Sequence, residues 1–583
     1  MKFVIIFAIL LTTFINSSAQ ISIDENFDDW EALTPLYIDS TGDGGSIEFF
    51  RLWLSDDETF LYYCFDTGSE INLQELNDIT LYLDLDNNNT TGKSVNGIGA
   101  ELEYTFGDRG GKIYVNGGSL NISHPDLFLI TAPTVTSSIF EGVIKKDLSS
   151  LGLSFNVSDS ITVVLKDGTS GDMIPEAGEI LYYSQQNIAG EYFTDYSIKK
   201  QDDNFLRFMT YNVERDGITD IQKREYFKRM LSVIDPDIIA FQEIYNSNSQ
   251  TIATLVNSFF DDGRSYYHAK QGSDNIVLSK FPITASYQIP ASSGFHQNGA
   301  FIVDMSEKYG KQALVISAHT PCCSNNDGRQ DEIDAIMAFV RNAKNDGGTI
   351  TLEEGSPIFI AGDMNLVGYN RQLKTFLTGD IFNNSSYGPD FAPDWDESDF
   401  EDSKPGNPNL PLYFTWYDEG SDYSPGRLDF IIYPGSVLEK VNSFTMYTPS
   451  MPADTLNTYG LNQNDAINAA DHNPVIADFK LEIVSGLKGT GNNLNPEQLK
   501  LFQNYPNPFN PSTIIDYELN TSSDVNFNLI SVTGEIVEKA ELGYKNQGRY
   551  SLRLDLSKFN SGVYFYQFVA GSEVLTKKML LIK

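Results

Sequence analysis

The spacing of apolar residues divides the chain into stretches of different character, and the first of them is all-β. Between residues 20 and 200, short apolar-rich runs at 60–65, 79–85, 101–106 and 161–165 are separated by Gly, Asn and Asp. Runs of this length bounded by turn residues are typical of antiparallel strands. Residues 20–200 therefore predict a β-sandwich.

From about residue 205 to residue 480 the apolar pattern alternates between helical and strand spacing. Residues 221–233 and 332–340 place apolar side chains on one helical face, whereas 314–316 and 358–360 are continuous apolar runs. Continuous runs are typical of strands that helices cover. Residues 205–480 therefore predict an α/β domain. A polar, glycine-containing linker at 485–497 then leads to a last all-β stretch at 499–583.

The beginning of the chain has a different pattern. Lys2 is followed by an apolar run and then by the small residues Ser17 and Ala19. This is the form of a signal peptide at 1–19, cleaved before Gln20. No later segment approaches the roughly 18 apolar residues of a membrane-spanning helix. We therefore expect an exported protein with no transmembrane segment after signal removal.

Charge and cysteine content narrow the picture further. The formal net charge is −39, which repels polyanions at long range. The three cysteines, Cys64, Cys322 and Cys323, are too few for a disulfide framework. Cys322 and Cys323 are adjacent, so either a vicinal disulfide or a pair of free buried thiols fits the sequence.

One turn of the first stretch offers several oxygen atoms at alternate positions. Asp84, Asp86 and Asn88 lie in the run DLDNNN. Calcium prefers such oxygen clusters. However, Asp and Asn also fill turns because they tolerate unusual backbone angles and bond their own backbone. Both a calcium site and a plain turn therefore remain open.

Polar residues with catalytic potential stand where the predicted strands of the α/β domain end. They occur in six short stretches, at 208–214, 238–243, 315–319, 359–365, 427–431 and 470–474. In order and spacing, this set resembles the endonuclease/exonuclease/phosphatase superfamily, which includes deoxyribonuclease I, apurinic endonucleases, neutral sphingomyelinases and inositol polyphosphate phosphatases. The resemblance implies a four-layer α/β sandwich and metal-dependent hydrolysis of phosphoesters.

The resemblance also implies a metal-binding group. Glu243 matches the family's glutamate ligand, with Asn212 beside it and Asp471 completing the site or holding a second ion. Glu214 is a weaker candidate ligand. Carboxylate and amide oxygens suit Mg²⁺, which we expect here, although Mn²⁺ and Ca²⁺ are also compatible.

Catalytic roles follow from the same match. His472 is the expected general base, because an imidazole titrates near neutral pH and can take a proton from water. Asp429 matches the carboxylate that orients this imidazole. Asp363 and Asn365 would bind the phosphate and position the nucleophile, and His319 would contact a nonbridging oxygen.

One position departs from the family pattern. Many relatives have an arginine where this chain has Asn298, before Gly299 and Ala300. A lost arginine removes a permanent positive charge that could contact phosphate. Arg329 or His296 is then expected to substitute for it, or the substrate requires less clamping.

The substrate class is less sharply indicated. Acidic residues outnumber basic ones in 205–480, whereas nonspecific nucleases usually carry a basic groove. An extracellular endonuclease-like enzyme is nevertheless the first expectation, with nucleic acid as the favoured substrate. The alternatives are a sphingomyelinase-like or other phosphodiesterase or phosphatase acting on a lipid or small molecule, and a non-catalytic surface protein that binds glycan.

The two ends of the mature chain resemble known modules. The run LFQNYPNPFNPST at 501–513, with SGVY at 561–564 and Lys577-Lys578, closely resembles the type A sorting domain of the type IX secretion system. It implies a small immunoglobulin-like β-sandwich, the type IX secretion machinery as partner, and a secreted or surface location. The opening IDENFDDW at 23–30 resembles family 9 carbohydrate-binding and DOMON-like modules, which implies a glycan partner.

Overall fold

The computed structural model describes residues 21–481 and 499–583, except 40, 41, 43, 156–158, 188–191, 293, 295–297, 346, 347, 503, 505, 508, 520, 533, 534 and 572. The predicted signal peptide, the predicted linker and His296 lie outside these residues. The chain divides into two compact units, Met1–Val484 and Ser485–Lys583. No helix among the described residues has the length and apolar character needed to cross a bilayer.

The N-terminal part of the first unit consists of two antiparallel sheets. One has the order β1 (Tyr37–Ile38), β2 (Arg51–Asp56), β3 (Phe60–Ile71), β11 (Ser137–Lys145), β10 (Ile130–Ala132). The other has the order β13 (Met173–Ile174), β12 (Ser160–Asp167), β4 (Ile79–Asp84), β7 (Leu102–Thr105), β8 (Gly110–Val115), β9 (Gly118–Ile122), with β14 (Leu181–Ser184) also paired to β12. Both sheets supply side chains to one buried core, including Phe65 and Phe140 from one and Leu81 and Val163 from the other. The short helices α1 (Asp28–Glu31) and α2 (His124–Leu127) belong to this part.

The α/β part is built on two mixed sheets. The first has the order β17 (Tyr267–Gln271), β18 (Asn275–Ser279), β16 (Ile238–Gln242), β15 (Leu206–Asn212), β26 (Val475–Lys480), β25 (Glu439–Thr445). The second has the order β19 (Ile283–Gln288), β20 (Gly299–Asp304), β21 (Gln312–His319), β22 (Ile358–Asp363), β24 (Asp429–Tyr433), β23 (Glu401–Asp402). Strands β15 and β16 are parallel, as are β21 and β22, and the other pairs are antiparallel.

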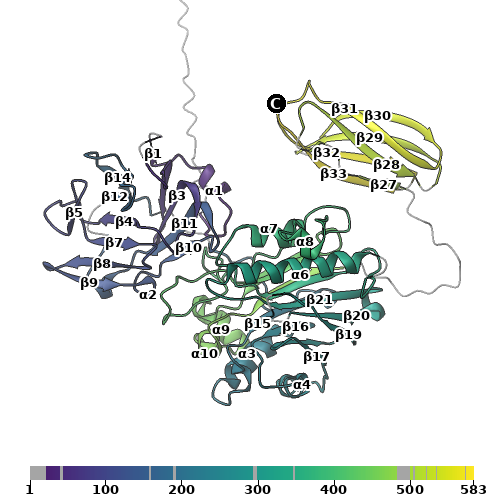
Figure 1. Cartoon of the computed structure of the whole chain (residues 1–583), viewed down its shortest axis with the longest axis horizontal. Helices are drawn as coiled ribbons and strands as arrows, with labels where there is room; N and C mark the ends of the chain where they lie inside the picture. The colour runs from purple at the N-terminus through teal and green to yellow at the C-terminus, as the bar shows by residue number, and fades with distance from the viewer. Residues whose placement is uncertain are drawn as a thin grey trace, which may run out of the picture. The chain divides into compact units, whose positions relative to one another are not determined.

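Helices cover the outer faces of these two sheets, which pack against each other (Figure 1). Phe208 of β15 stacks on Phe359 of β22 with ring centroids 4.6 Å apart, inside a core shared by the two sheets. Helices α3 (Arg224–Ile234), α4 (Ser249–Asn257), α9 (Ala453–Tyr459) and α10 (Asp465–Ala469) cover the first sheet. Helices α6 (Asn326–Lys344), α7 (Arg371–Thr378) and α8 (Asn384–Tyr387) cover the second, and α5 (Ser306–Tyr309) joins β20 to β21. This is the four-layer arrangement that the sequence predicts.

The β-sandwich and the α/β part are joined by a continuous apolar contact. Ile23 and Trp30 of the sandwich lie in one buried cluster with Leu412, Phe414 and Tyr447. The Ile23 amide donates to the Pro411 carbonyl over 2.8 Å. The two parts therefore form one compact unit, whereas the sequence predicts two separate domains.

The second unit also has two antiparallel sheets. One has the order β27 (Leu499–Leu501), β28 (Ser512–Leu519), β31 (Gly548–Asp555), and the other has β30 (Ile536–Lys545), β29 (Ser523–Ser531), β32 (Gly562–Ala570), β33 (Glu573–Leu581). Tyr517, Phe527, Tyr566 and Phe568 lie in its buried core. Alternation of buried and exposed residues along β28 is the pattern expected when one face of a sheet is wet.

Candidate active site

Strand register brings the predicted catalytic side chains to one edge of the paired sheets. Strand β21 pairs with β22 so that His319 lies opposite Asp363, and β22 pairs with β24 so that Asp363 lies opposite Asp429. Asn212 ends β15 in the first sheet and lies opposite Gln242, the last residue of β16. Glu243 follows Gln242 directly and therefore lies beside Asn212. Side chains that are far apart in sequence thus converge because neighbouring strands end together.

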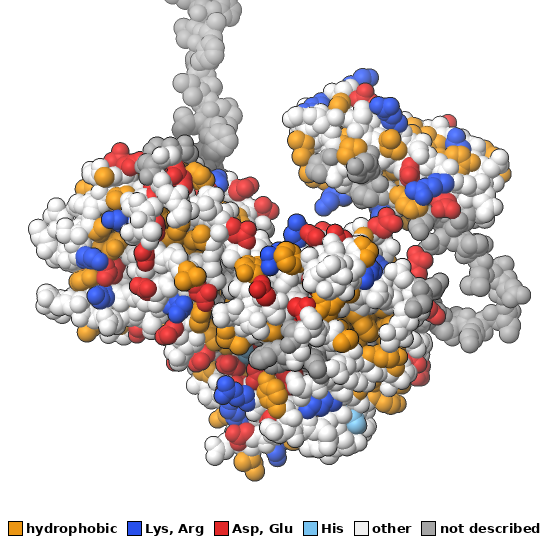
Figure 2. Space-filling view, viewed as in Figure 1, with side chains coloured by type: hydrophobic (Ala, Val, Ile, Leu, Met, Phe, Trp, Pro, Cys, Tyr) orange, Lys and Arg blue, Asp and Glu red, His pale blue; other side chains and the backbone are white. Residues whose placement is uncertain are grey.

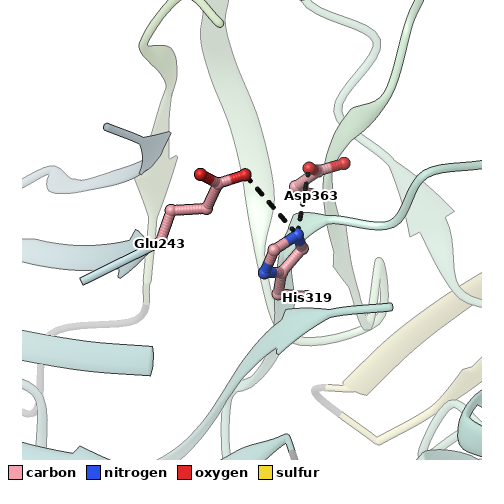
Figure 3. A group of neighbouring side chains, drawn as sticks. All are labelled: Glu243, His319 and Asp363. Atoms are coloured by element: carbon pink, nitrogen blue, oxygen red, sulfur yellow. Dashed lines mark ion pairs between the residues drawn. The ribbon is translucent and has the colours of Figure 1, made fainter. Parts of the chain in front are cut away.

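Asp363 lies at the centre of this group. Its Oδ2 is 3.6 Å from His319 Nε2, 3.6 Å from His472 Nε2 and 3.0 Å from the Nδ2 of Asn212. Figure 3 shows Glu243, His319 and Asp363 pointing toward one another, with Glu243 directly after β16 and the other two at the ends of β21 and β22. Burial raises the pKa of Asp363 to about 6, while His472 and His319 act to lower it.

His472 and Asp429 form a buried imidazole–carboxylate pair. His472 Nδ1 lies 2.8 Å from Asp429 Oδ2, which also accepts from the Thr415 hydroxyl over 2.7 Å. Burial alone would lower the pKa of His472, but the charges of Asp429 and Asp363 outweigh burial and raise the pKa well above its usual value. The Nε2 atom faces Asp363. His472 thus joins Glu243, His319 and Asp363 in one group of side chains, which we call the cleft.

A second imidazole–carboxylate pair holds His319. Its Nδ1 is 2.6 Å from Asp274 Oδ2, and its backbone amide donates to Asn298 Oδ1 over 2.8 Å. Burial would lower the pKa of His319, but the hydrogen bond to Asp274 and the charges of Asp363, Asp274 and Glu243 raise it to about 9. With no cation beside them, these carboxylates favour the charged form of the imidazole. Asn298 thus holds the His319 backbone.

Asp274 and Thr415 are supporting residues that the motifs of the chain do not include. Asp274 directly precedes strand β18 in the run SDNIVLS, so a carboxylate at a strand end was a usable signal. Thr415 lies in a loop with no motif around it. Only the fold brings its hydroxyl to Asp429.

Two overlapping groups could hold a metal ion: Glu243, His319 and Asp363 form one, and Asp363, Asp429 and His472 form the other. Within each group the ligand atoms all lie within 4.8 Å of one another. Glu243 keeps an exposed fraction of 20% for its side chain, and its Oε1 lies 3.9 Å from His319 Nε2. With Asp274 and Asp429 close by, the cleft gathers four carboxylates around two imidazoles, and Asp429 Oδ1 is buried without a hydrogen-bond partner. Excess carboxylate in a buried cleft is the donor set that suits a hard divalent cation, so the residues fit such an ion.

Asn212 and Asp471 are placed differently from the predicted ligand set. The Asn212 Nδ2 donates to Glu243 Oε1 over 3.1 Å, while its Oδ1 accepts from the Glu214 amide. In this arrangement the Nδ2 of Asn212 holds the carboxylates of Glu243 and Asp363. Its role as a metal ligand stays a prediction. Asp471 Oδ2 accepts from the Trp416 indole over 3.2 Å.

Three weaker predictions concern Glu214, Arg329 and His296. Glu214 is paired with Lys223 at 2.7 Å and its side chain is 40% exposed. Arg329 is fully buried, and its guanidinium donates to the Pro321 and Cys323 carbonyls and to Asn326 Oδ1. Its donors are therefore used to shape the loop after β21, and the expectation that it binds substrate phosphate is corrected. The other substitute proposed for the missing arginine, His296, lies outside the described residues.

The loop after β22 is held from several directions. The Asn365 amide donates to Asp363 Oδ1 over 3.0 Å, and its Nδ2 donates to the Thr320 carbonyl over 3.0 Å. Its φ of +46° is one that asparagine tolerates. Cys322 and Cys323, in the neighbouring loop, are free and exposed, with their Sγ atoms 2.7 Å apart, so the expectation of buried thiols is wrong.

Comparison with known proteins agrees with this geometry. Residues 209–450 match the model of the Endonuclease/Exonuclease/phosphatase family, and residues 503–583 match the secretion system C-terminal sorting domain. The chain carries both domains. Both sequence resemblances are thereby confirmed, and the sorting domain indicates type IX secretion and a secreted or surface location.

Solved structures similar to the chain are distant in sequence. They include the 2′,3′-cyclic phosphatase ANGEL2 in complex with adenosine-2′,3′-vanadate (15% identity, TM-score 0.31, covering 50% of this chain and 98% of that chain). Others are sphingomyelinase C from Streptomyces griseocarneus (14%, 0.26, 47% and 99%) and an AP endonuclease from Leishmania major (12%, 0.28, 48% and 89%). No curated protein matches the chain.

Proposed function

We propose that the cleft hydrolyses phosphodiesters with the help of a divalent cation, most simply Mg²⁺, and that the substrate is extracellular nucleic acid. The observation that carries this proposal is the convergence of Glu243, Asp363, His319 and His472 within a few ångströms. A phosphodiester is anionic and resists an anionic nucleophile, so its hydrolysis needs charge neutralisation and a base together. Both kinds of group are present in this cleft.

Each side chain has a separate task in the proposed reaction. His319, held positive by Asp274, contacts a nonbridging phosphate oxygen and stabilises the charge that develops there. Asp363 and Asn365 orient the phosphate and the attacking water. His472 Nε2 takes the proton of that water, while Asp429 holds the imidazole ring through Nδ1.

The protonation state of His472 links catalysis to the cation. A base must be neutral, whereas the carboxylates around His472 raise its pKa in the cleft without the ion. A cation held by Glu243 and Asp363 would supply positive charge that offsets these carboxylates and polarises the phosphate. Asp363, 3.6 Å from His472 Nε2, connects the two sites.

The charge of the chain bears on which substrate the enzyme recognises. Acidic and basic side chains are interspersed over the visible face of the molecule (Figure 2), and the chain carries a net charge of −39. Long-range attraction to a polyanion is therefore weak, and recognition falls on the groups inside the cleft. A lipid or small phosphodiester is the alternative substrate with the same chemistry.

Export is proposed to be part of the function. Removal of residues 1–19 by signal cleavage and recognition of an immunoglobulin-like tail by the type IX machinery would deliver the enzyme to the outside or to the cell surface. A glycan partner for the N-terminal sandwich also remains a proposal.

A substrate panel tests the proposed function. Purified protein is incubated with plasmid DNA, RNA, sphingomyelin and bis-p-nitrophenyl phosphate, each with Mg²⁺ and with EDTA. We expect hydrolysis that EDTA abolishes on at least one substrate, and the substrate concerned identifies the class. If none of the four substrates is hydrolysed, the result would contradict the proposal and favour a binding protein.

A further inference from the structure

A second group of carboxylates lies far from the cleft, in the β-sandwich. Asp84, Asp86 and Glu101 each offer an oxygen atom, and these atoms lie within 4.8 Å of one another. Asp84 ends β4, and Glu101 directly precedes β7, which pairs with β4 through Leu83 and Leu102. The register of two neighbouring strands therefore brings Asp84 and Glu101 together.

Two of these carboxylates keep a buried oxygen with no hydrogen-bond donor. Asp84 is 2% exposed and Glu101 is 7% exposed. Asp84 Oδ2 accepts from the Gly99 amide and Glu101 Oε2 from the Leu85 amide, but Asp84 Oδ1 and Glu101 Oε1 have no partner. Burying such an oxygen without a partner is costly, and more so beside a second negative charge.

No basic side chain among the described residues compensates this charge. Lys93 of β5 is paired with Glu103 of β7, and no described ion pair includes Asp84, Asp86 or Glu101. The three negative charges are therefore brought together without an ion-pair partner among the described side chains. A cation would provide the missing partner.

The surrounding loop is closely packed and leads to solvent. Residues 86–92 lie against the hairpin of β5 (Lys93–Val95) and β6 (Ile98–Ala100), and a Cβ at Gly99 would lie 2.3 Å from the Thr91 carbonyl oxygen. Asp86 and Glu101 line a surface pocket of about 800 Å³, together with Tyr114 and residues 116–119. An ion can therefore reach the carboxylates from this pocket.

The geometry points to a binding site for a calcium ion formed by Asp84, Asp86 and Glu101. Calcium is favoured over a transition metal because all the ligand atoms are oxygens, and over magnesium because the loop and pocket allow further carbonyl and water ligands. Asn88, which the sequence suggests as a ligand, is used otherwise. Its Oδ1 accepts from the amide and hydroxyl of Thr90 and so closes the turn. Glu101, distant in sequence, takes its place.

Calcium binding to the full chain tests this site by isothermal titration calorimetry. The chain is stripped of metal with a chelator, and wild type is compared with Glu101→Gln and Asp86→Asn. Because the number of charged ligands sets the affinity of calcium sites, we expect each variant to bind one Ca²⁺ about tenfold or more weakly than wild type. Glu103→Gln is the matched control, since Glu103 lies two residues on in β7 and pairs with Lys93. It should bind calcium as wild type does.

A further variant separates this site from the catalytic cleft. Glu243→Gln removes a carboxylate of the cleft and should leave the sandwich calcium site intact. Unchanged calcium binding in both Glu101→Gln and Asp86→Asn would overturn the proposal, as would loss of all calcium binding in Glu243→Gln. If circular dichroism shows that Glu101→Gln does not fold, the half-buried Asp86 decides the matter through Asp86→Asn alone. None of these outcomes depends on whether the cleft hydrolyses phosphodiesters.

Discussion

Asp274 and Asn298 hold His319 from two sides, the first through the imidazole Nδ1 and the second through the backbone amide. Asp274 Oδ2 also accepts from the Glu243 amide over 3.1 Å. One carboxylate thus fixes both the charged imidazole and the proposed metal ligand. At the scale of single residues, the cleft depends on such supporting groups as much as on the groups that touch substrate.

Replacement of Asp274 tests this positioning role. Asp274→Asn should lower kcat by roughly 10- to 100-fold, because the imidazole loses the partner that orients it and keeps it charged. In a His319→Ala background the same change should have little further effect, since the two residues act as one unit. Additive losses in the double variant would show that Asp274 acts independently of His319.

Glu243 should determine how much metal the enzyme needs. Glu243→Gln keeps the size of the side chain but removes one negative charge from the proposed site. We expect the Mg²⁺ concentration for half-maximal activity to rise by about tenfold or more. Glu225→Gln, at an exposed position in the first turn of α3, is the control and should leave the metal requirement unchanged. An unaltered requirement in Glu243→Gln would exclude Glu243 as a ligand.

At the scale of elements, strand ends and strand register explain why the sequence was informative. Asn212, His319 and Asp363 end their strands, so a polar residue after an apolar run located each of them. The resemblance to the family, based on the order of the motifs, then predicted the roles of His472 and Asp429. By contrast, the burial of Arg329 depends on the path of the loop before α6, and the hydroxyl of Thr415 reaches Asp429 across 14 residues. Such contacts have no local periodicity and could not be predicted.

Strands β15 and β26 are joined by a buried ion pair that should be important for stability. Arg207 is fully buried and makes two hydrogen bonds of 2.7 Å to the carboxylate of Asp478. Arg207→Ala would leave Asp478 as an unpaired buried charge, so we expect a loss of about 3–5 kcal/mol in the free energy of unfolding. Urea unfolding followed by fluorescence measures this loss.

The exposed pair Lys480–Glu439, at the end of the same strand, provides the comparison. Its side chains are 58% and 65% exposed. Solvent screens such a pair, and Lys480→Ala should therefore have a far smaller effect than Arg207→Ala. Equal effects of the two substitutions would mean that the buried pair contributes no more than a surface pair.

At the scale of the whole molecule, the sandwich directly supports the loop after β22, which contains Asn365. The Thr134 hydroxyl donates to the Leu366 carbonyl, Asn72 Nδ2 to the Val367 carbonyl, and the Thr136 amide to the Gly368 carbonyl. These three carbonyls follow Asn365 in the chain. The sequence predicted both modules but not this contact, because two surfaces that meet in the fold carry no shared motif.

Deletion of the second compact unit and deletion of the β-sandwich should have different effects. Removal of residues 485–583 should leave kcat and the melting temperature of the remaining unit unchanged, because that unit has its own cores. Removal of residues 21–200 should lower both, because it exposes Leu412, Phe414 and Tyr447 and frees the loop after Asn365. Scanning calorimetry and a phosphodiesterase assay of both truncated chains check this. A tail deletion that inactivates the enzyme would contradict it.

The rate of bis-p-nitrophenyl phosphate hydrolysis by His472→Ala in saturating Mg²⁺ tests the central claim most directly. If His472 is the base of a phosphodiesterase cleft, kcat should fall by about 10²- to 10⁴-fold while circular dichroism stays unchanged. His268→Ala serves as the matched control and should retain full activity, because His268 hydrogen-bonds to Ser249 and Gln250, neither of which belongs to the cleft. Turnover by His472→Ala equal to that of wild type would contradict the account.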